Sequence, residues 1–210
     1  MDRPAPTLDF WYEFASTYSY PAAMRIEALA AERGCALRWR PFLLAPLFAE
    51  QGWRDSPFNL YPVKGRYMWR DLARVCAALG LPLQPPEPFP QNSLLAARVA
   101  LALPWSRRAA FSRAVYAAEF GEGRSISDRG LIARRLSELG EDAAAALARA
   151  ESGENKAALK AACEEAKSLG LPGAPCCVTA DGEVFWGNDR LDEALAFALR
   201  AAGAGSARAP

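Results

Sequence analysis

The first 40 residues contain two short apolar runs separated by a helical pattern. Residues 8–14 are mainly apolar and aromatic, which predicts a buried strand, and residues 37–41 alternate apolar and charged side chains, as in a half-buried strand. Between them, Ala22, Ile26 and Leu29 recur at the spacing of one helix face. A helical crossover between two strands predicts that the strands are parallel.

The middle of the chain has helical periodicity. Met68, Leu72, Val75 and Leu79 predict one apolar helix stripe, and the prolines within residues 82–90 predict an extended connection after it. Further helices are expected over residues 93–103, 111–120 and 128–169, the last region being broken at Gly140 and near Gly153.

Strand patterns return near the end of the chain. Residues 176–180 and 183–186 flank Asp181-Gly182, which is a strong signal for a two-residue hairpin. A helix with leucines on one face follows. The order is therefore β-α-β, a block of helices, and then β-β-α.

This order predicts an α/β fold in one domain. The chain has 210 residues, of which 51% are hydrophobic, which suffices for one well-buried core. We expect residues 1–210 to form a single domain with an all-helical insertion at about residues 60–168, because helices divide a small sheet.

Composition excludes several classes of function. Lys and Arg number 25 against 24 Asp and Glu, so a broad nucleic-acid-binding surface is not expected. No run of about 18 apolar residues predicts a membrane helix, and no signal-peptide pattern precedes the first strand. Five cysteines without paired ligand spacing and the absence of histidine predict no metal site. We expect a protein of the reducing cytoplasm.

Ser16 lies where the first predicted strand gives way to the first predicted helix. A helix N-terminus stabilises an anion through free N–H groups and a partial positive charge, and a hydroxyl there can donate to a thiolate. The alternative is that Ser16 or Thr17 only caps the helix. Because the chain contains no histidine, Ser16 lacks the usual base of a covalent nucleophile.

Pro175 opens the strand that begins the late hairpin. Proline cannot donate to a sheet ladder, so it indicates either an ordinary trans proline on an edge strand or a special turn with a cis peptide. A cis bond would expose the Ala174 backbone to a ligand. The adjacent Cys176 and Cys177 point to opposite faces of a strand, so buried thiols are expected rather than a disulfide.

Residues 186–190, Trp-Gly-Asn-Asp-Arg, join the last strand to the last helix. Asn188 is a suitable N-cap, and Asp189 favours the first helical turn electrostatically. Capping alone would explain both residues. Alternatively, an acidic group and free N–H donors can hold the ammonium and carboxylate of an amino acid.

Taken in order, these segments resemble a known thioredoxin-like family. It contains disulfide oxidoreductases, kappa-class glutathione transferases and 2-hydroxychromene-2-carboxylate isomerases, and the resemblance covers roughly residues 7–200. The segments that carry it are residues 9–20, 40–42, 64–68, 89–93, 173–175 and 186–190.

The resemblance implies a thioredoxin-like fold with a helical insertion, usually in a homodimer, and a glutathione-dependent isomerase with a small aromatic substrate. Ser16 takes the place of the reactive cysteine of the oxidoreductases and would hydrogen-bond the glutathione sulfur. It also implies a cis Ala174-Pro175 peptide. The residues implied to bind glutathione are Ser16, Ala174, Trp186, Gly187, Asn188 and Asp189. Those implied to lie nearer the organic substrate or the glycyl end are Asn59, Lys64 and Asn92.

Two positions depart from the family pattern, and three other functions remain open. Thr17 stands where the isomerases commonly have proline, and Ala49 where relatives often have lysine. One alternative is a glutathione transferase or peroxidase, and another is a non-catalytic binding or chaperone module. The third is a thiol-disulfide oxidoreductase, which would need a reactive Cys176 or Cys177, since no Cys-x-x-Cys occurs.

Overall fold

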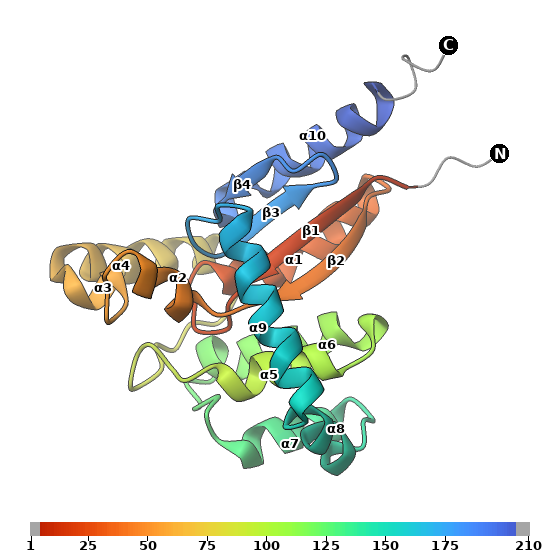
Figure 1. Ribbon diagram of the computed structural model, residues 1–210. Helices are drawn as coiled ribbons and strands as arrows, with labels where there is room; N and C mark the ends of the chain where they lie inside the picture. The colour runs from red at the N-terminus through yellow and green to blue at the C-terminus, as the bar shows by residue number, and fades with distance from the viewer. Residues whose placement is uncertain (1–4, 205–210) are drawn as a thin grey trace.

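The computed structural model describes residues 5–204 and contains a four-stranded sheet in the order β2-β1-β3-β4 (Figure 1). β1 pairs parallel with β2 and antiparallel with β3, and β3 pairs antiparallel with β4. The predicted β-α-β unit and late hairpin are therefore confirmed, as is the thioredoxin-like α/β fold. The predicted two-residue hairpin connection was wrong, because residues 180–183 lie between the ends of β3 and β4. The strands and the flanking helices are β1 (Thr7–Tyr12), α1 (Ser19–Glu32), β2 (Ala36–Pro41), β3 (Cys176–Thr179), β4 (Val184–Trp186) and α10 (Leu191–Ala204).

The first strand is shorter than predicted. It ends at Tyr12, although the apolar run continues to Phe14, which is fully buried. The reason is a tight turn, in which the Ser16 N–H donates to the carbonyl of Glu13 at 3.0 Å. Hydrophobicity therefore marked the buried residues correctly, whereas the turn decided where the strand ends.

Helices fill the chain between β2 and β3. They are α2 (Leu44–Glu50), α3 (Pro57–Leu60), α4 (Pro62–Ala78), α5 (Leu94–Ala102), α6 (Trp105–Tyr116), the π-helix η1 (Ala117–Gly121), α7 (Arg129–Glu138), α8 (Ala143–Ala150) and α9 (Gly153–Ser168). Within residues 5–204, none is both long and apolar enough to cross a membrane. The division into one domain with an insertion at about 60–168 stays a prediction.

The prediction that Leu79 belongs to the buried apolar stripe of α4 was wrong. Met68 and Leu72 are buried, but Leu79 is 41% exposed. The helix ends at Ala78, so Leu79 no longer follows its face. Cys76, one turn after Leu72, is buried in its place.

The sheet is covered on both faces (Figure 1). α1 and α10 contact each other, α1 contacts β2, and α10 contacts β1, β3 and β4, while α9 contacts β2. On the face of the strands opposite to α9, the Trp39 ring packs edge-on against Phe10 and Tyr12, with centroids 5.0 and 5.3 Å apart. β1 is therefore buried on both sides, which explains why its residues from Leu8 to Tyr12 are apolar except for Asp9.

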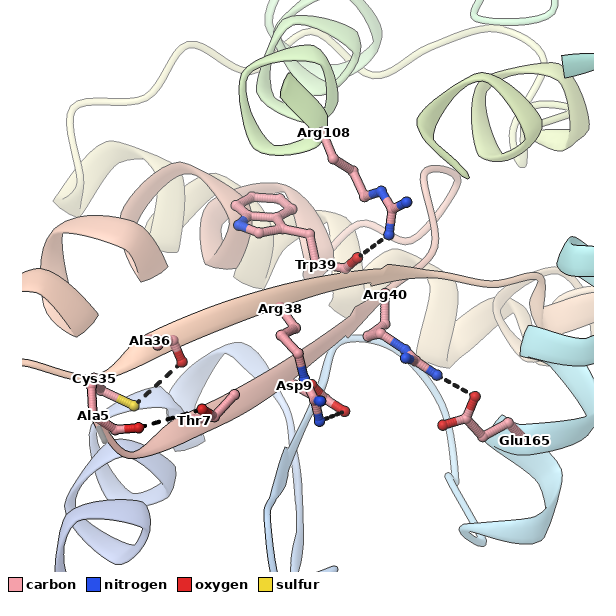
Figure 2. Close-up of polar contacts among 10 residues, drawn as sticks. All are labelled: Ala5, Thr7, Asp9, Cys35, Ala36, Arg38, Trp39, Arg40, Arg108 and Glu165. Atoms are coloured by element: carbon pink, nitrogen blue, oxygen red, sulfur yellow. Dashed lines mark hydrogen bonds and ion pairs between the residues drawn. The ribbon is translucent and has the colours of Figure 1, made fainter. Parts of the chain in front are cut away.

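Charged side chains line the strands beneath α9 (Figure 2). Arg38 on β2 makes a two-bond contact with Asp9 on β1, and one of these bonds measures 2.8 Å. Arg40 pairs with Glu165 of α9, and its guanidinium lies 4.6 Å from the Trp11 ring centroid. The Arg40–Glu165 pair ties α9 to β2, whereas the Arg38–Asp9 pair joins the two parallel strands to each other.

Arg108 of α6 joins the helical block to the edge strand β2 (Figure 2). Its guanidinium donates to the carbonyls of Trp39 at 3.0 Å, Ala100 at 2.8 Å and Leu101 at 3.2 Å. The last two carbonyls belong to the C-terminal turn of α5, where helix carbonyls lack partners within the helix. Arg108 is only 5% exposed, so one buried side chain satisfies acceptors from two elements.

We expect Arg108→Met to lower the free energy of unfolding by about 3 kcal/mol, because three buried carbonyls lose a donor worth about 1 kcal/mol each. Arg107→Met is the matched control, since Arg107 lies beside it but forms a partly exposed pair with Glu141 and donates to a single carbonyl, that of Leu139. Its loss should cost about 1 kcal/mol. Urea unfolding of both variants measures the difference, and equal losses would contradict the assignment.

Candidate active site

Ser16 does not cap α1, which corrects one of the two alternatives for this residue. The helix begins at Ser19, with Tyr18 in the N-cap position and no side-chain cap bond. Ser16 is 8% exposed, and its Oγ donates to the carbonyl of Ala174 at 2.9 Å. Thr17 does not cap the helix either, because its hydroxyl donates to the Met68 sulfur at 3.2 Å. Because the turn at residues 13–16 precedes the helix, the hydroxyls of Ser16 and Thr17 bond to Ala174 and Met68, which lie far away in the sequence.

The loop before β3 lies directly against Ser16. The Ala174-Pro175 peptide is cis, as expected from the family resemblance. β3 is an interior strand, so the alternative of an edge-strand proline was wrong. The carbonyl of Pro175 accepts from the N–H of Gly187 at 2.9 Å. Two hydrogen bonds thus join three distant segments, from Ser16 to the 174–175 loop and from that loop to Gly187.

Two glycines let the loops come close together. A Cβ at position 173 would lie 2.8 Å from Nε1 of Trp186, whose ring is 56% exposed beside the loop. Gly187 has φ +124°, and a Cβ there would lie 2.4 Å from an Asp189 carboxylate oxygen. A side chain at position 173 would therefore collide with the Trp186 ring. Gly187 is required because its positive φ is strained for a residue that carries a side chain.

Asn188 and Asp189 follow in the short 3₁₀ helix η2 (Asn188–Arg190). Asn188 is buried and does not cap a helix, because its Oδ1 accepts from Nε of Arg25 at 3.2 Å. Its backbone carbonyl accepts from the same guanidinium at 2.5 Å. Asp189 is exposed in the first turn, as expected, and its carboxylate lies 3.8 Å from Arg190. Sequence analysis missed Arg25, since no local signal marks a partner 163 residues away.

Two of the residues expected nearer the organic substrate lie on neighbouring loops. Asn59 of α3 donates to Asp55 and to the carbonyl of Phe89, with the latter distance 3.3 Å. Asn92 accepts from the N–H of Leu94, the first residue of α5, at 3.1 Å, while Ser93 occupies the N-cap position of that helix. Both side chains are exposed, and none of their hydrogen bonds within residues 5–204 joins them to Ser16.

Lys64, the third of these residues, lies on the helix that contacts the Ser16 turn. Its ammonium sits 4.7 Å from the ring centroid of Tyr61. Met68, one helical turn further on, accepts the hydrogen bond from Thr17, the neighbour of Ser16. The fold therefore brings α4 against the turn, with Lys64 exposed near its beginning.

Comparison with known proteins agrees with this geometry. The model of the DSBA-like thioredoxin domain matches residues 7–198. A curated protein of Sphingobium xenophagum, named 2-hydroxychromene-2-carboxylate isomerase, is 30% identical over 187 residues, which cover 89% of this chain and 94% of that protein. The chain belongs to this isomerase family within the DSBA-like thioredoxin proteins. It is therefore an isomerase by descent.

Solved structures support the same family. The structure of a 2-hydroxychromene-2-carboxylate isomerase is 26% identical, covers 97% of this chain and 100% of that one, and gives a TM-score of 0.85. The cytosolic disulfide reductase DsbM from Pseudomonas aeruginosa, solved with GSH, is 20% identical. It covers 92% of this chain and 98% of that one, with a TM-score of 0.62, and so shows the shared fold.

The cysteines of this isomerase are unsuited to thiol-disulfide exchange. All five are free and buried. Burial raises the pKa of Cys176 to about 12 and raises the pKa of Cys177 as well, and Cys176 donates to the carbonyl of Gly173 at 3.1 Å. The thiolate is the reactive form of cysteine, so these thiols are inert at neutral pH. The oxidoreductase alternative lacks a reactive thiol here.

Two buried glutamates lie beneath the active-site turn. The carboxylate of Glu13 accepts from the N–H groups of Leu44 at 2.9 Å and Ala15 at 3.3 Å, and burial raises its pKa. Glu119 in η1 is fully buried, and neither of its oxygens has a hydrogen-bond partner within residues 5–204. Burial raises the pKa of Glu119 well above its ordinary value of 4.5, and the charge of Glu13 raises it further.

We expect Glu119→Gln to stabilise the protein increasingly as the pH rises. The raised pKa of Glu119 in the folded state means that wild-type stability is highest below 4.5 and falls above it, because the unfolded chain releases a proton that the folded chain retains. The neutral amide removes that loss, by up to about 1.4 kcal/mol per pH unit.

Denaturant unfolding at about pH 5 and about pH 8 measures this difference. Glu122→Gln is the matched control, because Glu122 lies in the same region but is exposed beside Arg135. A gain for Glu119→Gln that does not change between the two pH values would contradict the buried, protonated state.

Proposed function

We propose that this isomerase uses glutathione and acts on an aromatic compound of the 2-hydroxychromene-2-carboxylate type. The observation that carries the proposal is the hydrogen bond from Ser16 Oγ to the Ala174 carbonyl. It brings a hydroxyl donor and a half-buried piece of backbone together where the oxidoreductases of the fold would have a reactive cysteine. The names of the relatives and the GSH-containing neighbour agree with this choice.

The residues at this site fit glutathione chemically. Ser16 offers a hydroxyl, Ala174 offers backbone groups, and Trp186 offers an exposed ring beside the loop. Asp189 provides an exposed carboxylate for an ammonium group. The ligand has a thiol, peptide groups, an ammonium and carboxylates, so each of its parts has a counterpart among these residues.

Glutathione would supply a thiolate that adds to a conjugated double bond of the substrate and leaves again after rotation about the resulting single bond. Ser16 would favour that thiolate by exchanging its hydrogen bond from the Ala174 carbonyl to the sulfur. The freed carbonyl could then accept from a peptide N–H of the ligand. A free thiol titrates near 8.5, so a donor that stabilises the anion raises the reactive fraction at neutral pH.

Other residues of the site would bind the γ-glutamyl end of glutathione and the organic substrate. Trp186, Gly187, Asn188 and Asp189 would hold the γ-glutamyl end of glutathione. The donors Asn59, Lys64 and Asn92 would lie nearer the organic substrate or the glycyl end, and Lys64 supplies the positive charge that a carboxylate substrate needs.

The proposal includes a cytoplasmic homodimer. Five free and buried cysteines are typical of a reducing compartment. Large apolar side chains on α3 and α4 are exposed together, which is typical of interaction surfaces. They are Leu60, Tyr61, Val63 and Tyr67. We expect this patch to lie at or near the contact between two copies.

A turnover assay distinguishes an isomerase from its rivals. We expect chromene and benzylidenepyruvate compounds to isomerise only when glutathione is added, with the glutathione concentration unchanged at the end, because the thiol is released in each cycle. Consumption of glutathione would instead indicate a transferase or peroxidase. Failure to bind glutathione at millimolar concentration would favour a non-catalytic module.

We expect Ser16→Ala to lower kcat/KM about ten- to a hundredfold, because a charge-assisted hydrogen bond to the sulfur is worth roughly 1.5–3 kcal/mol. The pKa of the bound thiol should rise in this variant. The measurement is the pH dependence of thiolate absorbance in the glutathione complex, together with turnover.

Thr17→Val is the control for Ser16→Ala. It removes the neighbouring hydroxyl, which donates to Met68, while keeping the shape of the side chain. We expect it to change the thiol titration little. Superimposable titrations for wild type and Ser16→Ala, with unchanged turnover, would show that Ser16 does not act on the sulfur.

A further inference from the structure

Arg25 of α1 holds the segment that follows β4. Its Nε donates to the Asn188 side-chain oxygen at 3.2 Å, and its Nη2 donates to the Asn188 backbone carbonyl at 2.5 Å. Its Nη1 lies 3.7 Å from the carboxylate of Asp192. One guanidinium therefore contacts the main chain and the side chain of Asn188 and also the first turn of α10.

These contacts fix which way the Asn188 amide faces. The Arg25 guanidinium has only donors, so it binds the amide oxygen and leaves the NH₂ group directed elsewhere. Within residues 5–204, no hydrogen bond uses that NH₂ group as a donor. A free amide donor at the edge of the site suits an anionic acceptor such as a carboxylate.

Rotation of the amide is opposed by the same geometry. If Asn188 turned over, its NH₂ group would face the Arg25 guanidinium, and two donors would meet without an acceptor. Asn188 is only 7% exposed, so water cannot easily relieve that mismatch. Arg25 thereby sets the direction in which the NH₂ group of Asn188 points.

We propose that Arg25 is a positioning residue that aims the Asn188 amide donor at the α-carboxylate of the γ-glutamyl group of glutathione. This inference rests on the proposed function. Arg25 acts through Asn188, so it should affect affinity for the γ-glutamyl end and leave the chemistry at Ser16 unchanged. The chain supplies a matched control, because Arg33 also pairs with Asp192, at 2.6 Å, but has no contact with Asn188 among residues 5–204.

The experiment compares Arg25→Met and Arg33→Met with wild type, using glutathione and cysteinylglycine, which lacks the γ-glutamyl group. We expect Arg25→Met to raise the KM for glutathione about tenfold or more, with kcat at saturation within about twofold. Arg33→Met should change neither parameter by more than about twofold. Activity supported by cysteinylglycine should be equal in all three proteins, because Asn188 then has no carboxylate to bind.

Arg25→Lys keeps the charge but offers one nitrogen in place of the planar fork, so it should give an intermediate KM. It also keeps the test valid if Arg25→Met does not fold. Equal losses with glutathione and cysteinylglycine, or equal effects of Arg25→Met and Arg33→Met, would overturn the positioning role. Absence of glutathione binding by wild type would reject the proposed function, and the positioning role with it.

Discussion

The antiparallel pairing of β1 with β3 is the constraint on which the site depends. Trp11 near the end of β1 pairs with Cys176 at the start of β3, so the turn after one strand must meet the loop before the other. Ser16 and Ala174 are neighbours for that reason, although they are 158 residues apart. The pairing of Cys176 with Trp186 brings β4 and the segment after it to the same edge.

Two buried charged residues are accommodated in different ways. Arg108 is compensated by three carbonyls, so burial of its guanidinium ties the helical block to β2. Glu119 has no such partners within residues 5–204, and burial raises its pKa well above the ordinary value, which favours the neutral acid. A buried cation with acceptors stabilises a junction, whereas a buried acid without donors is stable only in its neutral form.

The site lies on a thioredoxin-like fold, but the side chain at position 16 is a hydroxyl and not a thiol. A hydroxyl at position 16 can donate a hydrogen bond to a thiolate but cannot form a disulfide. The nearest thiols along the chain from the cis-proline loop, Cys176 and Cys177, are buried with raised pKa values. The raised pKa values disfavour the nucleophilic thiolate form of both cysteines at neutral pH. This fits an isomerase in which the net redox state does not change.

The sequence by itself determined the elements whose signals are local. The β-α-β unit, the hairpin around Asp181-Gly182 and the helix breaks at Gly140 and near Gly153 follow from periodicity and turn chemistry, and the structure has them. Only the tertiary structure decided the partners of polar side chains. Ser16 and Asn188 are residue types that favour helix N-caps, yet each bonds to a residue more than 150 positions away. No local sequence signal marks the contacts of Arg25 and Arg108. Capping preferences are worth about 1 kcal/mol, so a tertiary acceptor or donor brought close by strand pairing can override them.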